Sequence, residues 1–189
     1  MSANVPVVIL AGGLGTRLRQ ETEHRPKPMV PVGHQPILWH IMKTYAHHGC
    51  RDFVLCLGYK GEVIRDYFIK YAGNTGDVRL DLGAGTQSHL GNTFEKVDWR
   101  VVLADTGEHT MTGGRIRRIR DYVAVVDRFM VTYGDGVANI DIAALLETHR
   151  RAGTVATVTG VNPTSRYGEL KLNGDRVVSF AEMEPFQDV

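Results

Sequence analysis

Apolar residues along the chain fall into short unbroken runs and longer stretches with helical spacing, and the two kinds alternate. Val5–Ala11 is an unbroken apolar run that ends at Gly12, and Phe53–Leu57 is a second one. Such runs are typical of strands buried on both faces, as in parallel sheets. Between and after them, Pro36–His47 and Glu62–Tyr71 place their apolar residues on one helical face. The order strand, helix, strand, helix predicts an α/β fold with a doubly wound, mainly parallel sheet.

The same patterns continue to the end of the chain. We expect further strands at Val78–Leu82, Arg100–Asp105, Phe129–Tyr133 and Val155–Val161, and helices at Gly114–Tyr122 and Ile140–Arg151. In the first of these helices, Ile116, Ile119 and Val123 are expected to face inward. Near the end, Tyr167–Leu172 and Val177–Ala181 alternate and are separated by Asn-Gly-Asp, which favours a C-terminal β-hairpin. The length of 189 residues is typical of one domain, so we expect a single domain over 1–189.

The composition of the chain argues against nucleic acid and membranes as binding partners. The chain carries 22 basic and 21 acidic residues, so its net charge of +1 provides no global attraction to nucleic acid or to a membrane surface. No apolar run reaches the roughly 20 residues that span a bilayer, and the N-terminus lacks the basic segment of a signal peptide. Cys50 and Cys56 form no CxxC motif and indicate no disulfide framework. We therefore expect a cytoplasmic protein that binds neither nucleic acid nor membranes.

The first predicted strand ends in a glycine-rich loop, Gly-Gly-Leu-Gly-Thr-Arg at Gly12–Arg17. Glycine permits positive φ, and its missing side chain lets backbone N–H groups approach phosphate oxygens closely. The loop is not a P-loop, because no Gly-Lys-Ser/Thr follows, and Leu18 stands where a dinucleotide fingerprint needs its third glycine. Two interpretations stay open: a phosphate-binding loop at the carboxyl end of a strand, or a plain tight turn.

Isolated cations follow the loop. Arg17 comes directly after it, and Lys27 stands between Pro26 and Pro28, which restrict the backbone. A triphosphate needs fixed positive charge where negative charge develops during displacement. The alternative is that both cations are solvated surface residues.

Two further glycine motifs carry candidate chemistry. Gly-Asp-Gly at Gly134–Gly136 follows an apolar run, so Asp135 either faces a bound cation such as Mg²⁺ or caps a turn. Thr-Gly-Gly-Arg at Thr112–Arg115 precedes a predicted helix. Its glycines, including Gly114, could let a base or ribose approach, and Arg115 could reach a pyrimidine edge or a phosphate.

The segments "LAGGLGTRL" and "RPKPMVPVG" together resemble the signature of the sugar-1-phosphate nucleotidyltransferases, the nucleotide-sugar pyrophosphorylases. Within that family, "PILWHIMKTYAHHG", "GYKGEVIRDYF", "DTGEHTMTGGRIRRIRDYV" and "TYGDGVANID" resemble the glucose-1-phosphate cytidylyltransferase branch. The resemblance extends from Val5 to about Glu182. It implies a Rossmann-like sheet of the nucleotide-diphospho-sugar transferase type.

The resemblance also implies a reaction. A phosphate oxygen of glucose 1-phosphate would attack the α-phosphorus of CTP, giving CDP-glucose and pyrophosphate with Mg²⁺ as cofactor and no covalent enzyme intermediate. Such enzymes align two anions and neutralise the charge that they share. The resemblance further implies a homo-oligomer. Two alternatives stay open: an enzyme of the same class that uses UTP or dTTP, and a non-catalytic, regulatory homologue that binds nucleotide sugars.

Site residues follow from the resemblance position by position. Leu10, Ala11, Gly12 and Gly13 would present backbone to the base and sugar of the nucleotide, and Thr16 and Arg17 would contact its phosphates. Lys27 would neutralise both reacting phosphates, and Asp135 would ligate the metal. Gly114 and Arg115 would contact the nucleotide, and Gly168 and Glu182 the sugar.

Two departures from the family pattern concern the C-terminal part. Met183 stands where the family has a lysine that meets the sugar phosphate, and methionine offers neither charge nor donor. Either the substrate is held differently, or the local alignment slips by one residue, or activity is weak. We also expect the family's final segment, which supplies a second acidic metal ligand, to be missing from these 189 residues.

Overall fold

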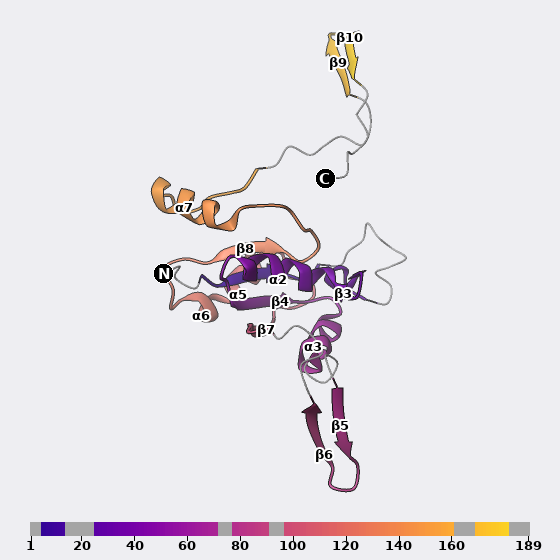
Figure 1. Ribbon diagram of the computed structural model, residues 1–189. Helices are drawn as coiled ribbons and strands as arrows, with labels where there is room; N and C mark the ends of the chain where they lie inside the picture. Colours follow the sequence, from indigo (N-terminus) through magenta and orange to yellow (C-terminus); the bar gives the residue numbers. More distant parts are fainter. Residues whose placement is uncertain (1–4, 14–24, 72–76, 91–96, 161–168, 182–189) are drawn as a thin grey trace. The chain divides into compact units, whose positions relative to one another are not determined.

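The computed structural model describes residues 5–13, 25–71, 77–90, 97–160 and 169–181 (Figure 1). In chain order the elements are β1 (Val7–Leu10), η1 (Lys27–Met29), β2 (Pro31–Val32), β3 (Gln35–Pro36), α2 (Ile37–His47), β4 (Asp52–Leu57), α3 (Gly61–Ile69), β5 (Asp77–Asp81), β6 (Thr86–Leu90), β7 (Arg100–Asp105), α5 (Thr112–Arg118), α6 (Arg120–Val123), β8 (Met130–Tyr133), α7 (Ile142–Ala152), β9 (Glu169–Asn173) and β10 (Arg176–Ala181). The chain divides into two compact units, Met1–Ala143 and Ala144–Val189. The expectation of a single domain stays a prediction.

The first unit is built on a parallel sheet of four strands in the order β7-β4-β1-β8. In the register, Val7 of β1 pairs with Phe53 of β4 on one side and with Met130 of β8 on the other. Phe53 in turn pairs with Val101 of β7. The non-sequential strand order with helical crossovers confirms the predicted doubly wound, mainly parallel α/β fold. It also brings the carboxyl ends of all four strands to one edge.

Helices α5 and α6 cover one face of this sheet. Because side chains alternate along a strand, Val8 and Leu10 of β1 share that face with Val54 and Cys56 of β4. These residues form one buried cluster with Ala104, Ile119 and Val123. The prediction that Ile119 and Val123 face inward is therefore confirmed. The predicted helix at Gly114–Tyr122 is divided, because α5 ends before Ile119 and α6 begins at Arg120.

The alternate residues of β1 and β4 on the opposite face are also buried, Val7 and Ile9 fully so. Near them the Phe53 ring packs edge-on against Trp99, with centroids 5.7 Å apart, and Trp99 lies 5.8 Å from Trp39 of α2. The Trp39 indole N–H donates to the Tyr71 hydroxyl at 3.1 Å. Aromatic packing with a satisfied polar edge thus links α2 to the sheet.

The sequence predicted one of two antiparallel hairpins in full and only the first strand of the other. The predicted C-terminal hairpin is confirmed as β9 and β10, where Asn173 pairs with Arg176 across a two-residue turn. Gly174 in that turn has φ 60°, a conformation that favours glycine. The strand predicted at Val78–Leu82 is present as β5, one residue earlier, but its partner β6 was not predicted.

The strand predicted at Val155–Val161 is wrong over its described residues. Residues 155–160 have no strand structure, and the Val155 and Val158 side chains are exposed. No described strand pairs with this segment. Its apolar residues alone could not make it a strand, because a strand also needs a neighbour for its backbone hydrogen bonds. Among the described residues, no helix is both long and apolar enough to cross a bilayer.

Candidate active site

The backbone that follows β1 is held at the carboxyl edge of the sheet by its neighbours on both sides. The Ala11 N–H donates to the Cys56 carbonyl at 3.1 Å, and the Gly134 N–H donates to the Leu10 carbonyl at 3.1 Å. The Gly12 carbonyl accepts from the Tyr59 N–H at 3.2 Å. Gly12 is buried, whereas Gly13 is exposed. The chain therefore leaves the sheet along a fixed path, which we call the cradle (residues 10–13).

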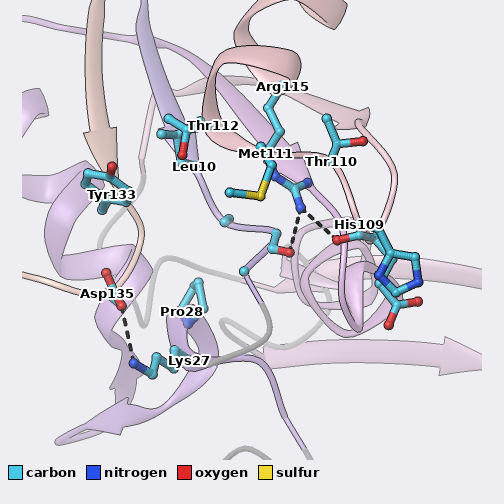
Figure 2. A pocket seen from close by; sticks show the side chains of 14 residues that line it. Leu10, Lys27, Pro28, His109, Thr110, Met111, Thr112, Arg115, Tyr133 and Asp135 are labelled. Atoms are coloured by element: carbon cyan, nitrogen blue, oxygen red, sulfur yellow. Dashed lines mark hydrogen bonds and ion pairs between the residues drawn. The ribbon is translucent and has the colours of Figure 1, made fainter. Parts of the chain in front are cut away.

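The cradle forms one wall of a pocket of about 350 Å³ within the first unit. The other walls come from η1, from the loop that joins β7 to α5, and from the end of β8 (Figure 2). Figure 2 shows Lys27 and Asp135 together on one side of this pocket, with Arg115 and His109 on another. The pocket lies outside the carboxyl ends of parallel strands, where open α/β sheets bind ligands. Its size suits a nucleotide-sized ligand.

Lys27 and Asp135 form an ion pair at one side of the pocket, with Nζ 3.7 Å from Oδ2. The Lys27 side chain is 19% exposed and the Asp135 side chain 45%. At this separation the ammonium is near the carboxylate without a short hydrogen bond, so its donors can turn toward a ligand. The pair thus places one cation and one accessible carboxylate at the same pocket.

Proline and glycine position this ion pair. Lys27 begins the short helix η1, where the Met29 N–H donates to the Pro26 carbonyl at 2.8 Å. A Cβ on Gly134 would lie 3.0 Å from Pro28 Cγ, so the residue before Asp135 packs tightly against the residue after Lys27. The Pro-Lys-Pro and Gly-Asp-Gly motifs, about a hundred residues apart in the sequence, therefore pack against each other. Their contact gives a structural reason for the proline that follows the lysine.

Arg115 is a buried member of the site. Its side chain is only 5% exposed, and its guanidinium donates to the carbonyls of Leu57, Gly12 and Glu108 and to the Thr106 hydroxyl. Burial lowers the pKa of Arg115, and the nearby Arg118 lowers it further. A guanidinium nevertheless stays charged in proteins. The site therefore holds a fixed positive charge behind the cradle.

The structure gathers most of the predicted site residues that it describes. Those that line the pocket are Leu10, Ala11, Gly12, Gly13, Lys27, Arg115 and Asp135. Gly114 does not line it and lies in α5, where a Cβ would contact the Thr110 side chain. Thr16, Arg17, Gly168 and Glu182 lie outside the described residues, as does Met183. The roles assigned to all these residues stay predictions.

Several pocket residues had not been assigned from the sequence. They are Pro28, Glu108, His109, Thr110, Met111, Thr112 and Tyr133. Tyr133 ends β8 directly before the Gly-Asp-Gly motif, and Thr112 begins α5. The others, apart from Pro28, belong to the loop between β7 and α5. A usable signal existed: both segments follow predicted strands, and the carboxyl ends of parallel strands meet at one edge.

The residues at this pocket fit Mg²⁺ held jointly with a ligand. The described residues contain no cluster of three or more His, Cys, Asp or Glu side chains that would form an all-protein metal cage. Mg²⁺ is usually bound through one or two carboxylates together with substrate phosphates and water. Asp135 offers such a carboxylate with nearly half of its side chain accessible.

A nucleotide-sized pocket at the carboxyl edge of a doubly wound sheet, with fixed cations and a carboxylate, is the arrangement expected of an enzyme that binds nucleotides. The sequence profile of the nucleotidyl transferase family matches residues 6–183, so the chain belongs to that family and is an enzyme of the nucleotidyltransferase class.

Individual relatives narrow the comparison. The chain is 47% identical over 176 residues to the glucose-1-phosphate cytidylyltransferase of Salmonella typhimurium, covering 93% of this chain and 67% of the relative. It is 41% identical over 175 residues to a probable glucose-1-phosphate cytidylyltransferase of Bacillus subtilis, with the same two coverages. Among solved structures, HddC from Yersinia pseudotuberculosis complexed with GMP-PN is similar with a TM-score of 0.60 and 29% identity. That match covers 94% of this chain and 69% of HddC.

Proposed function

We propose that the protein transfers a cytidylyl group from CTP to glucose 1-phosphate, giving CDP-glucose and pyrophosphate in a Mg²⁺-dependent reaction. One observation carries the proposal. The cradle, Lys27 and Asp135 converge on one pocket in a chain that is 47% identical to a glucose-1-phosphate cytidylyltransferase over 93% of its length. A solved relative that holds a guanosine nucleotide analogue supports nucleotide binding on this fold.

The proposed chemistry is a single displacement at phosphorus. A phosphate oxygen of glucose 1-phosphate forms a bond to the α-phosphorus of CTP, and the bond from that phosphorus to the oxygen bridging to the β-phosphate breaks. The electron pair of the broken bond leaves with pyrophosphate. Because no bond to the protein is needed, catalysis rests on alignment and charge stabilisation.

Lys27 is the residue we assign to charge stabilisation. Its ammonium lies at the pocket, 3.7 Å from its carboxylate partner, and so can donate to phosphate oxygens of both substrates. Two phosphate groups that approach each other repel, and that repulsion is greatest in the transition state. A fixed ammonium should therefore lower the barrier more than it strengthens ground-state binding.

Asp135 is the residue we assign to holding Mg²⁺. When bound, the ion would neutralise phosphate charge and polarise a phosphoryl oxygen. Asp135 also orients the Lys27 ammonium through their ion pair. The cradle lines the pocket, and we assign it to presenting backbone groups to the nucleoside.

Pyrophosphate release tests the proposal. The chain would be assayed with glucose 1-phosphate, Mg²⁺ and each of CTP, UTP, dTTP and GTP. We expect release with CTP at least about a hundredfold faster than with the others, because a base-reading site rejects bases with the wrong donors and acceptors. Release with a different nucleotide would move the assignment to another branch of the family. Nucleotide binding without release would contradict catalysis by this chain.

We also propose that the enzyme works in the cytoplasm as a homo-oligomer. Cys50 and Cys56 are both buried free thiols, which supports a reducing compartment. Light scattering coupled to gel filtration would test the assembly, and a monomer at micromolar concentration would contradict it.

A further inference from the structure

The Arg115 guanidinium joins the carboxyl ends of three adjacent strands. One terminal nitrogen, Nη2, donates to the Gly12 carbonyl after β1 at 2.8 Å and to the Glu108 carbonyl at 3.0 Å. The other, Nη1, donates to the Leu57 carbonyl at the end of β4 at 2.9 Å and to the Thr106 hydroxyl after β7 at 2.6 Å. All four donors of the two terminal nitrogens therefore have protein acceptors.

The space around this guanidinium is closed by two glycines. A Cβ on Gly58 would lie 2.6 Å from Arg115 Nη1, and a Cβ on Gly12 would lie 2.6 Å from Cζ. Both separations are shorter than real Cβ contacts allow. Gly58 does not line the pocket, so no ligand there explains why this position lacks a side chain. The buried arginine explains it together with the Gly12 carbonyl oxygen, which would lie 2.7 Å from the same Cβ.

Fixing the Gly12 carbonyl also fixes the neighbouring N–H. The peptide that joins Gly12 to Gly13 is planar and trans, so its C=O and N–H point in opposite directions. Its oxygen is held by Arg115 and by the Tyr59 N–H. The Gly13 N–H therefore points away from the guanidinium, and Gly13 is exposed at the pocket.

We propose that Arg115 is a positioning residue that clamps the cradle in its nucleotide-binding conformation, with Gly12 and Gly58 providing the space for its guanidinium. This inference rests on the proposed function only in taking the pocket as the nucleotide site. It separates two uses of the paired glycines: Gly12 accommodates the clamp, and Gly13 faces the ligand.

The clamp and a direct substrate contact make different predictions. An arginine that reads the base would matter more for CTP than for UTP, and one that binds the outer phosphates would matter more for CTP than for CMP. A clamp acts before any ligand contact. Its loss should therefore weaken the binding of CTP, UTP and CMP by the same factor.

The decisive variants are Arg115→Ala and Arg115→Lys, and Gly58→Ala is a companion, because a Cβ on Gly58 would displace both the guanidinium and the Gly12 carbonyl that it holds, although Gly58 does not line the pocket. Dissociation constants for the three nucleotides would be measured for the wild type and these variants, after circular dichroism has shown that each variant is folded. We expect each variant to raise the dissociation constants of all three nucleotides by about tenfold or more, and by equal factors. The reason is that small displacements of positioning groups are costly. Gly160→Ala is the control, since a Cβ there meets nothing within 4 Å and Gly160 does not line the pocket.

Three results would overturn the clamp. They are unchanged affinities in Arg115→Ala, a loss in Arg115→Ala confined to CTP, and a loss confined to the triphosphates. If Arg115→Ala does not fold, Arg115→Lys decides instead, because lysine keeps the charge but cannot bridge the same acceptors. If the wild type bound UTP but not CTP, the proposed function would fail. The clamp would then be tested by the factors by which the variants weaken the binding of UTP and UMP.

Discussion

At the scale of single residues, the site depends on one ion pair held between rigid neighbours. Pro28 packs against Gly134, and this contact brings Lys27 to within 3.7 Å of Asp135. A flexible lysine would lose side-chain entropy each time it met a phosphate. The prolines and the glycine contact reduce that loss before the ligand arrives.

Lys27→Ala should reduce turnover far more than CTP affinity, because its charge matters most in the transition state. We expect kcat to fall by about 10²–10³-fold, the range seen when one preorganised charge donor is removed. Steady-state kinetics and calorimetry would measure the two effects. Lys70→Ala is the control, because Lys70 is 62% exposed and pairs with Asp66 on the surface. Equal losses in kcat and affinity would contradict the role given to Lys27.

Asp135→Asn should weaken CTP binding in the presence of Mg²⁺ and have little effect when EDTA is present. The amide keeps the shape but removes the charge that the ion needs. Calorimetric titration of CTP with and without Mg²⁺ would measure the difference. An unchanged Mg²⁺ dependence would make Asp135 a structural residue.

The sequence could predict some of these residues and not others, for a physical reason. Lys27 and Asp135 stand out because charges between prolines or glycines are unusual in a chain. Tyr133 and Met111 line the same pocket but are of types that also occur in ordinary cores and surfaces. Only the strand order shows that their segments meet at one edge. The sequence pattern could likewise not predict the hydrogen bonds of Arg115, because their acceptors come from several segments of the chain.

At the scale of elements, β4 is the most completely buried strand after β1. Five of its six residues are buried, and it lies between β1 and β7. Strands paired on both sides often consist of unbroken apolar runs, which is why β1 and β4 were predicted with nearly correct bounds. The same logic failed at Val155–Val161, because an apolar run does not reveal whether a partner strand exists.

Truncating the core of β4 should destabilise the protein strongly. Leu55 is fully buried, so Leu55→Ala should lower the free energy of unfolding by about 2–5 kcal/mol. Val125→Ala should change it by less than about 0.5 kcal/mol, because Val125 is 88% exposed. Urea unfolding of both variants would measure the difference. A small effect at Leu55 would mean that the sheet repacks around the cavity.

Stability should fall at alkaline pH through Cys56 of β4. Burial raises the pKa of the Cys56 thiol to about 11. In the unfolded chain the thiol loses its proton near its ordinary pKa of 9.0, so above that pH the unfolded state binds fewer protons and stability falls as pH rises. The contribution is fully present below the ordinary pKa and disappears toward the folded pKa.

Cys56→Ala should remove part of that alkaline loss. Between pH 8.5 and 10 the wild type should lose about 1 kcal/mol more than the variant, from the slope of about 1.4 kcal/mol per pH unit for one proton. Val54→Ala on the same strand is the control, because it removes buried apolar atoms without removing a titrating group. Parallel pH curves for the wild type and Cys56→Ala would contradict the prediction.

At the scale of the whole molecule, the pocket draws its walls from residues 10–135 of the first unit. A ligand that binds only when these segments are assembled must stabilise the folded state. CTP with Mg²⁺ at a hundred times its dissociation constant should therefore add about 2.7 kcal/mol to the free energy of unfolding. Thermal unfolding with CTP and Mg²⁺, and then with EDTA, would measure it. No gain at saturation would mean that CTP does not bind the folded chain or binds the unfolded chain equally well.

The parallel pairing of β1 with β8 has a consequence for synthesis on the ribosome. Val7 finds its partner Met130 only after more than a hundred further residues have been added. Until then β1 has one unpaired edge, and closing so long a loop is slow. A nascent chain can thus pair β1 with β4 early, but Lys27 waits for Asp135 until β8 has emerged. The Lys27–Asp135 pair would therefore be among the last features of the unit to form, and nucleotide binding would report the completion of folding in newly made chains.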